Sequence, residues 1–246
     1  MPEAEMQAQV TLEAAGTSLS CMASRLACRH TADMDLAYFL RERTALIRHF
    51  YDAASAPFIE TKRLIEASEP PFQNPPRDDN GEPAFMEEWS RADVELELLG
   101  RACITMLSES IKHYLQGWER EVPLTAAAVK AMGTKGFVRA YVDHYCTQLG
   151  LQDCPADLDV IEQVVLARNS AQHNGNLVMT TVEHDSKTRT KYPRPFFTRP
   201  GGPDETPDGL DTFLGEWVHV DREKLLRATE QVDILADWLQ EQIYAR

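Results

Sequence analysis

The strongest constraint on this chain is a helical spacing of apolar residues that recurs along it. In residues 33–67, and again in residues 85–118, these side chains fall mostly three, four or seven positions apart. The defining positions are Leu36, Leu40, Ile47, Phe50 and Ala54 in the first segment and Leu96, Leu99, Cys103, Met106, Ser110 and Tyr114 in the second. Such spacing places one apolar face along an α-helix. We therefore predict two long amphipathic helices, the first kinked or split at Pro57 because proline cannot donate a backbone hydrogen bond.

Capping residues predict further helices toward the C-terminus. The expected helices cover residues 125–132, 136–149, 157–173 and 221–244. Asp157 and Asp221 suit helix N-caps, because a short side-chain oxygen accepts a free N–H of the first turn. Gly150 and the Asn174-Gly175 pair suit helix ends, since both residue types tolerate a left-handed backbone.

The remaining segments predict loops and a small β element. Residues 68–83 hold five of the 14 prolines and form a loop. Residues 177–182 and 216–220 resemble short strands, and a basic, Pro-rich excursion lies within 177–220. We therefore predict an all-α bundle of four to five main helices, with a small β-hairpin insertion before the C-terminal helix.

Length, composition and charge limit the domain organisation and the partners that this chain can have. The 246 residues suit a single helical domain over 32–246, preceded by a weakly structured arm over 1–31. No run of 18 apolar residues occurs and no signal peptide is recognised, so we expect no membrane partner. Five scattered cysteines fit a reducing cytoplasm. The net charge of −14 argues against general nucleic-acid binding, which needs clustered positive charge.

Residues 165–175 carry the most suggestive chemistry in the chain. Arg168 continues the Ile161–Val165 stripe, so its guanidinium is expected to point toward the core or an interface. A charge there is costly unless it is paired, bound to an anion or partly solvated. Asn169 lies four positions before His173, so the amide can orient the imidazole.

The spacing of arginine and histidine is not distinctive by itself. Three pairs have it, namely Arg25 and His30, Arg139 and His144, and Arg168 and His173. Only the third pair combines Asn169 after the arginine with the Asn174-Gly175 stop. Five positions correspond to about 140° around an ideal helix, so one helix does not bring Arg168 and His173 tightly together. A second copy from a two-fold partner would help.

With these features, segment 168–173 resembles the HEPN family (higher eukaryote and prokaryote nucleotide-binding). The family signature is an arginine, usually followed by asparagine, with a histidine after four to six residues. The segment 217–221, followed by an amphipathic terminal helix, is also similar. The resemblance implies a helical two-fold dimer with both motifs facing a cleft, and often metal-independent RNA cleavage. It further implies a toxin or antiviral effector restrained by an antitoxin protein, although some members are catalytically silent.

The chemistry that the resemblance implies needs no metal, because RNA carries its own 2′-hydroxyl nucleophile. His173 would act as general base, or as acid to the leaving 5′-oxygen. Arg168 would stabilise charge on the pentacoordinate phosphate, and Asn169 would hold the imidazole. The products would carry 2′,3′-cyclic phosphate ends, and DNA would be inert because it lacks the hydroxyl.

A local basic patch offers a second candidate site. Residues 186–203 contain five cations and no acid, with aromatic residues interleaved. The candidate RNA-contacting residues are Lys187, Arg189, Lys191, Tyr192, Arg194 and Arg199. Aromatic faces beside cations suit stacked bases and phosphates. The alternative is a solvated surface loop whose aromatics, Phe196 and Phe197 included, attach it to the bundle.

Other constellations are weak. No metal-ligand spacing and no cofactor or covalent-nucleophile motif is recognised, so we expect neither a metal nor a cofactor. The carboxylates in residues 87–97 are interpreted as a solvated helix face. The leading hypothesis is a homodimeric HEPN-type ribonuclease. The alternatives are a catalytically silent RNA- or protein-binding module of the same fold, and a helical scaffold with an accidental motif.

Overall fold

The computed structural model describes residues 35–73, 84–173, 181–182, 184–199 and 217–245, except for the side chain of His173. The chain divides into two compact units, Met1–Leu36 and Ala37–Arg246. The expected arm over 1–31 lies outside the described residues, and the packed helices belong to the second unit. None of the described helices has the length and apolarity needed to cross a membrane.

The described residues are mostly helical, which confirms the all-α prediction. The helices are α2 (Leu36–Glu66), α3 (Met86–Gly117), α4 (Ala126–Lys135), α5 (Phe137–Leu149), α6 (Leu158–His173), α7 (Ser186–Lys191) and α9 (Arg222–Tyr244), with a 3-10 turn, η1, at Trp118–Arg120. Their bounds match the predicted segments closely. The short helix α7 was not expected.

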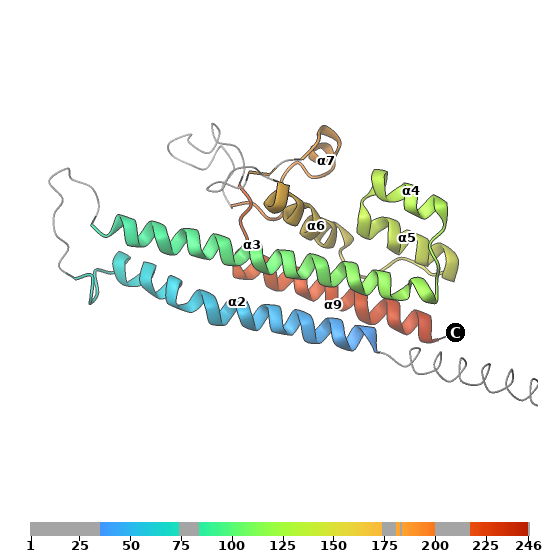
Figure 1. Ribbon diagram of the computed structural model, residues 1–246, viewed down its shortest axis with the longest axis horizontal. Helices are drawn as coiled ribbons and strands as arrows, with labels where there is room; N and C mark the ends of the chain where they lie inside the picture. Colours follow the sequence, from blue (N-terminus) through green and yellow to red (C-terminus); the bar gives the residue numbers. More distant parts are fainter. Residues whose placement is uncertain (1–34, 74–83, 174–180, 183, 200–216, 246) are drawn as a thin grey trace, which may run out of the picture. The chain divides into compact units, whose positions relative to one another are not determined.

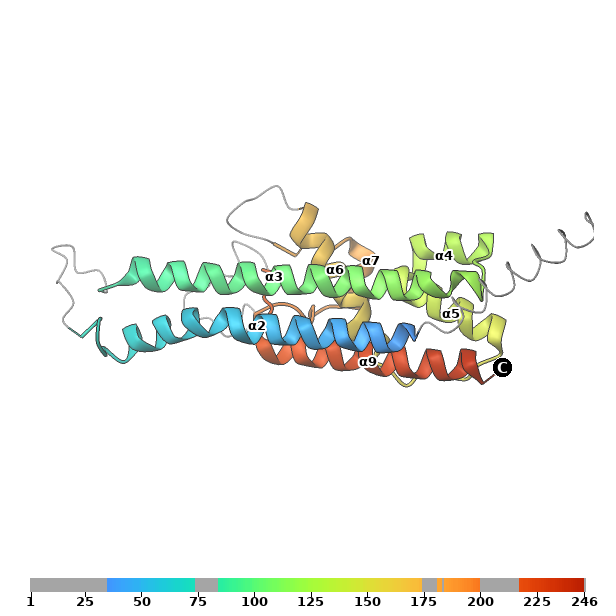
Figure 2. The ribbon, with the colours of Figure 1, turned by 60° about the horizontal axis from the view of Figure 1, so that its bottom comes forward.

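Helices α2, α3 and α9 run side by side (Figures 1 and 2). Polar contacts fix α2 antiparallel to α9: Ala37 N donates to Gln240 Oε1 at 2.8 Å, and Arg222 Nε donates to Asp52 Oδ1 at 2.7 Å near the other end. Helix α6 packs against α3 and α9, and α5 connects α6 with α4. Helix α3 therefore packs against both α6 and α9.

The buried face of α2 differs from the predicted stripe. Phe50 is exposed and Tyr51 is buried in its place, while Thr44 is fully buried. Thr44 Oγ1 donates to Asp233 Oδ1 of α9 at 2.6 Å, so part of this interface is polar and apolar spacing could not reveal it. Pro57 does not split the helix. Both Pro57 and Ala53, whose carbonyl loses its N–H partner, are exposed, so water can satisfy that carbonyl.

The buried face of α3 is broader than a single stripe. Leu99, Cys103 and Tyr114 are buried as predicted, but Met106 and Ser110 are only half-buried. Ile104, Leu107 and Ile111 are buried instead, together with Leu115. A helix that packs against α9 on one side and α6 on the other needs a second apolar row.

The predicted β-hairpin is not present in the described residues. Single antiparallel bridges join Thr181 to Trp217 and Thr198 to Val218. Because Trp217 and Val218 pair with different segments, no two-stranded ladder forms there. Of the predicted strand residues, 177–180 and 216 lie outside the described residues.

Two glycines allow close approaches between neighbouring segments. A Cβ on Gly100 of α3 would lie 2.6 Å from the carbonyl oxygen of Val220. A Cβ on Gly136, which has φ of +98°, would overlap Oε1 of Glu162. Gly100 therefore lets the segment before α9 rest on α3, and Gly136 lets Glu162 of α6 reach the start of α5.

Candidate functional site

The first half of α6 is fixed by hydrogen bonds to neighbouring segments. Asp157 Oδ1 accepts the N–H groups of Asp159 and Val160, as predicted for an N-cap. Glu162 is buried, and its Oε2 accepts the Val138 N–H at 3.1 Å at the start of α5. Burial raises the pKa of Glu162, although the backbone donors oppose this. These hydrogen bonds hold the first half of α6 in place, and the second half extends from it.

Arg168 projects from the second half of α6 toward α3. One terminal nitrogen of its guanidinium forms an ion pair with Glu109 Oε1, and the other donates to Asn169 Oδ1 at 2.8 Å. The Arg168 side chain is 21% exposed and that of Glu109 37% exposed. The expected inward direction is observed, and the charge is both paired and partly solvated. Arg168 Nε is buried without a hydrogen-bond partner among the described residues.

Sequence reasoning did not find Glu109, which lies 59 positions from Arg168. Its Oε2 lies 3.8 Å from Lys112 Nζ on the same helix. The hydrogen bond from Arg168 is the main cause that lowers the pKa of Glu109, with further contributions from the charges of Lys112 and His113. We call Arg168, Asn169, Glu109 and Lys112 the Arg168 site.

The structure leaves the other motif residues partly defined. Asn169 is half-buried, and its Oδ1 accepts a hydrogen bond from Arg168. Helix α6 is described as far as His173, and neither the His173 side chain nor the Asn174-Gly175 stop is among the described parts. The pairing of Arg168 with His173 therefore stays a prediction.

The second arginine–histidine pair with this spacing, Arg139 and His144, makes separate contacts that hold α5 against its neighbours. Arg139 forms an ion pair with Asp159 of α6 at 2.6 Å. His144 is buried, with Nε2 3.0 Å from the Pro123 carbonyl oxygen. These two side chains contact different partners, so they do not form a joint site. The third pair, Arg25 and His30, lies outside the described residues.

A small cavity borders α6 one residue beyond Asn169. Its lining includes Ser170, His184 and Phe197, and its volume of about 10 Å³ suits roughly one water molecule. Ser170 Oγ and His184 Nδ1 lack hydrogen-bond partners among the described residues. Burial lowers the pKa of His184, and the nearby Arg189 adds to this. This cavity is too small for a nucleotide.

The basic segment is attached to the bundle at several points. Tyr192 is 8% exposed and its hydroxyl donates to Asp159 Oδ1 at 2.8 Å, while Phe197 is buried. The Phe196 N–H donates to Gln163 Oε1 at 2.6 Å. Tyr192 therefore offers no open face for a stacked base, which corrects the expectation for that residue. Its aromatic ring helps to attach the segment to α6.

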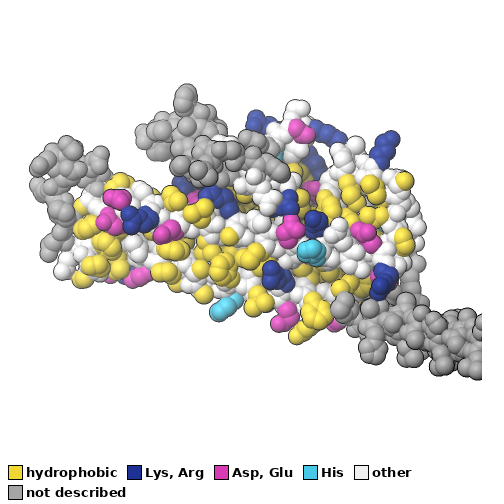
Figure 3. Space-filling model, viewed as in Figure 1, with side chains coloured by type: hydrophobic (Ala, Val, Ile, Leu, Met, Phe, Trp, Pro, Cys, Tyr) yellow, Lys and Arg dark blue, Asp and Glu magenta, His cyan; other side chains and the backbone are white. Residues whose placement is uncertain are grey.

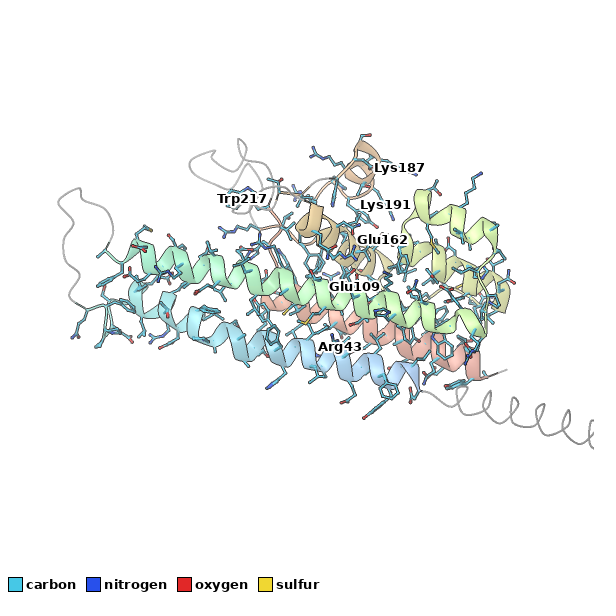
Figure 4. The ribbon with its side chains drawn as sticks, in the orientation of Figure 1. Arg43, Glu109, Glu162, Lys187, Lys191 and Trp217 are labelled. Atoms are coloured by element: carbon cyan, nitrogen blue, oxygen red, sulfur yellow. The ribbon has the colours of Figure 1, made fainter. Side chains whose placement is uncertain are left out.

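The cations of this segment fall into two groups. Lys187, Arg189 and Lys191 lie on α7 and are exposed, as is Arg194. Figure 4 shows Lys187 and Lys191 on α7. Lys187 Nζ donates to the Thr134 carbonyl, and Lys191 Nζ lies 3.7 Å from Asp159 Oδ1. Arg199 instead forms ion pairs with two carboxylates of α3 and is already neutralised. Arg199 is exposed as well, although it is paired, and contact of any of these cations with RNA stays a prediction.

Arg199 belongs to a second polar cluster on α3. Its guanidinium lies 3.0 Å from Asp93 Oδ2 and 3.2 Å from Glu97 Oε1. Glu97 Oε1 also accepts from His219 Nδ1 at 2.6 Å, and Lys62 of α2 lies 2.6 Å from Asp93. We call these five residues the Glu97 cluster. Asp93 and Glu97 are thus not part of a solvated helix face, contrary to the expectation for 87–97.

The surface over the second half of α3 mixes charges of both signs. Figure 3 shows acidic, basic and histidine side chains close together there, below the basic side chains of α7. Within the described residues, no group of three or more potential ligands is arranged to hold a metal ion.

No protein-family model, curated protein or solved structure matches this chain.

Proposed function

We propose that the protein is a metal-independent endoribonuclease of the HEPN type. The observation that carries the proposal is the placement of Arg168, whose guanidinium lies at the partly solvated junction of α6 and α3 beside Asn169. A planar guanidinium at an accessible surface suits a phosphate group. His173 ends the same helix, five positions further along.

The proposed reaction uses the 2′-hydroxyl of RNA as nucleophile. His173 removes its proton, or donates one to the leaving 5′-oxygen. Arg168 stabilises the charge on the pentacoordinate phosphate, and Asn169 orients the neighbouring groups. The 2′-oxygen forms a bond to phosphorus while the bond to the 5′-oxygen breaks, leaving a 2′,3′-cyclic phosphate and a 5′-hydroxyl.

The cellular setting follows from the same family resemblance. We propose a cytoplasmic homodimer that brings two copies of the motif to one cleft, acting as a toxin or antiviral effector under the control of an antitoxin. The exposed cations Lys187, Arg189, Lys191 and Arg194 flank the RNA path in this proposal. Expression of the active protein is then expected to arrest growth.

The deciding experiment is cleavage of mixed RNA in the presence of EDTA. We expect the wild type to cut RNA but not DNA and to leave 2′,3′-cyclic phosphate ends. Arg168→Ala and His173→Ala are each expected to lose most activity, and His144→Gln serves as a histidine control. RNA cleavage that survives His173→Ala would contradict the proposal.

A second function is favoured by one specific observation. Arg168 is already neutralised by Glu109, in a chain whose net charge is −14. A catalytically silent member of the same fold would bind RNA or a protein without cutting. Binding of RNA by a wild type that leaves it intact in the EDTA assay would identify this alternative.

A further inference from the structure

Helix α3 contributes three polar residues to the surroundings of Arg168. Glu109, Lys112 and His113 are spaced three and four positions apart, which places them on one face of the helix. Glu109 contacts Arg168 and lies beside Lys112, and His113 acts on it electrostatically. A carboxylate therefore sits among three groups that all favour negative charge.

The carboxylate occupies the part of Arg168 that a phosphate would need. A guanidinium binds phosphate best through two parallel N–H groups, and it binds carboxylates with the same geometry. One terminal nitrogen is already engaged with Glu109 and the other with Asn169. A phosphate can reach Arg168 in full only by replacing the Glu109 carboxylate.

The exchange is energetically accessible because the ion pair is not sealed in the core. The Glu109 side chain is 37% exposed, and such partly solvated pairs contribute about 1 kcal/mol or less. Lys112 is half-buried and His113 is exposed on the same face. Once Glu109 moves aside, the guanidinium and the ammonium face the same ligand.

We infer that Glu109 gates a phosphodiester-binding site formed by Arg168, Lys112 and His113. An RNA phosphate displaces the Glu109 carboxylate from Arg168, and the two α3 residues then contact the phosphodiester backbone. The identity of the ligand rests on the proposed function, whereas the displacement of one anion by another rests on the Arg168–Glu109 contact. Glu109 thus lowers affinity for RNA in the resting protein.

The test measures binding of an RNA that cannot be cleaved. A single-stranded oligonucleotide of about 12 residues with every 2′-hydroxyl methylated is labelled for fluorescence anisotropy. Glu109→Gln keeps an acceptor for Arg168 but removes the charge, so we expect binding about fivefold tighter. Lys112→Ala and His113→Ala are each expected to weaken binding about threefold. Glu88→Gln removes an exposed charge about 30 Å away along α3 and is expected to change nothing.

A double-mutant cycle separates gating from a general charge effect. In an Arg168→Ala background, Glu109→Gln is expected to tighten binding much less than in the wild type, because only the contact with Lys112 and His113 remains. Equal tightening in both backgrounds, or no tightening in the wild type, would overturn the inference. So would equal tightening toward an oligo-aspartate peptide of the same charge, because the site would then select acidic protein rather than phosphodiester. Because the probe cannot be cut, the binding result does not depend on whether the protein cleaves RNA. The nuclease assay likewise does not depend on the effect of Glu109→Gln on binding.

Discussion

Helix α3 is held by ion pairs at two places, the Glu97 cluster and the Arg168 site, and the two differ in how fully their charges are matched. In the Glu97 cluster two carboxylates meet Lys62, Arg199 and His219, and the Asp93 and Glu97 side chains are 24% and 18% exposed. In the Arg168 site a single carboxylate, 37% exposed, meets the Arg168 guanidinium and lies 3.8 Å from Lys112, and Arg168 Nε has no partner among the described residues. The carboxylates of the first arrangement are less exposed and have more cationic partners than the carboxylate of the second, which we call the open contact.

This difference separates a structural anchor from an exchangeable contact. The Glu97 cluster joins α3 to α2, to the end of the basic segment and to the residues before α9, so several segments depend on it. The Arg168 site joins only α3 to α6, which already pack through apolar residues. A function in which an anion must enter fits the open contact better, because its more exposed carboxylate is easier to displace.

The largest expected effect is the loss of Glu97. Glu97→Ala leaves His219 and part of Arg199 without their shared acceptor in a mostly buried place, so we expect a loss of about 2 kcal/mol in the free energy of unfolding. Urea unfolding followed by circular dichroism measures it. Glu95→Ala, two positions away, is the control and should cost less than about 0.5 kcal/mol. Equal losses in both variants would show that the cluster is not an anchor.

The next effect concerns the close approach that supports this anchor. Gly100→Ala places a Cβ 2.6 Å from the Val220 carbonyl oxygen, which pushes the segment holding His219 away from α3. Overpacking of this kind costs about 1–3 kcal/mol, and the better helix propensity of alanine returns about 1 kcal/mol. We expect a net loss of about 1 kcal/mol by urea unfolding. Gly133→Ala, with open space around the new Cβ, should instead stabilise the protein.

The sequence predicted those features whose signals are local. The Asp221 side chain accepts the Lys224 N–H at 2.8 Å, and Gly150 adopts a left-handed conformation after α5. Each of these interactions lies within a few residues of the amino acid that signals it. Helix bounds could therefore be predicted closely.

Features set by distant segments could not be predicted in this way. Glu109 meets Arg168 across 59 positions, and Glu97 meets His219 across 122. Periodicity showed that Arg168 points inward but not which residue balances its charge. The buried Thr44 of α2 illustrates the same limit, because its burial depends on Asp233 of α9. Tertiary partners decide these positions, and a single sequence does not name them.

The pH dependence of stability is expected to test the role of Glu97. Burial alone would raise the pKa of Glu97, but His219 and Arg199 outweigh it and hold the pKa below its ordinary value of 4.5. As the pH falls below that value the unfolded chain takes up the proton first, so the stabilising contribution is present above it and is lost toward the folded-state pKa. At pH 7 we expect the wild type to be more stable than Glu97→Gln by on the order of 1 kcal/mol. Unfolding in urea at pH 7 and pH 3 should show this gap closing in acid, and a constant gap would contradict the assignment.

The smallest expected effect is the loss of Glu109, and it is the most informative for function. Glu109→Ala removes a partly solvated carboxylate whose partner Arg168 keeps Asn169 and access to water, so we expect a loss of less than about 0.5 kcal/mol by urea unfolding. The same comparison at about 0.5 M salt should make this small loss smaller still, because salt screens an exposed ion pair. A loss as large as that of Glu97→Ala would mean that Arg168 needs Glu109 for folding. Such a result would remove the open contact on which the exchange of carboxylate for phosphate depends.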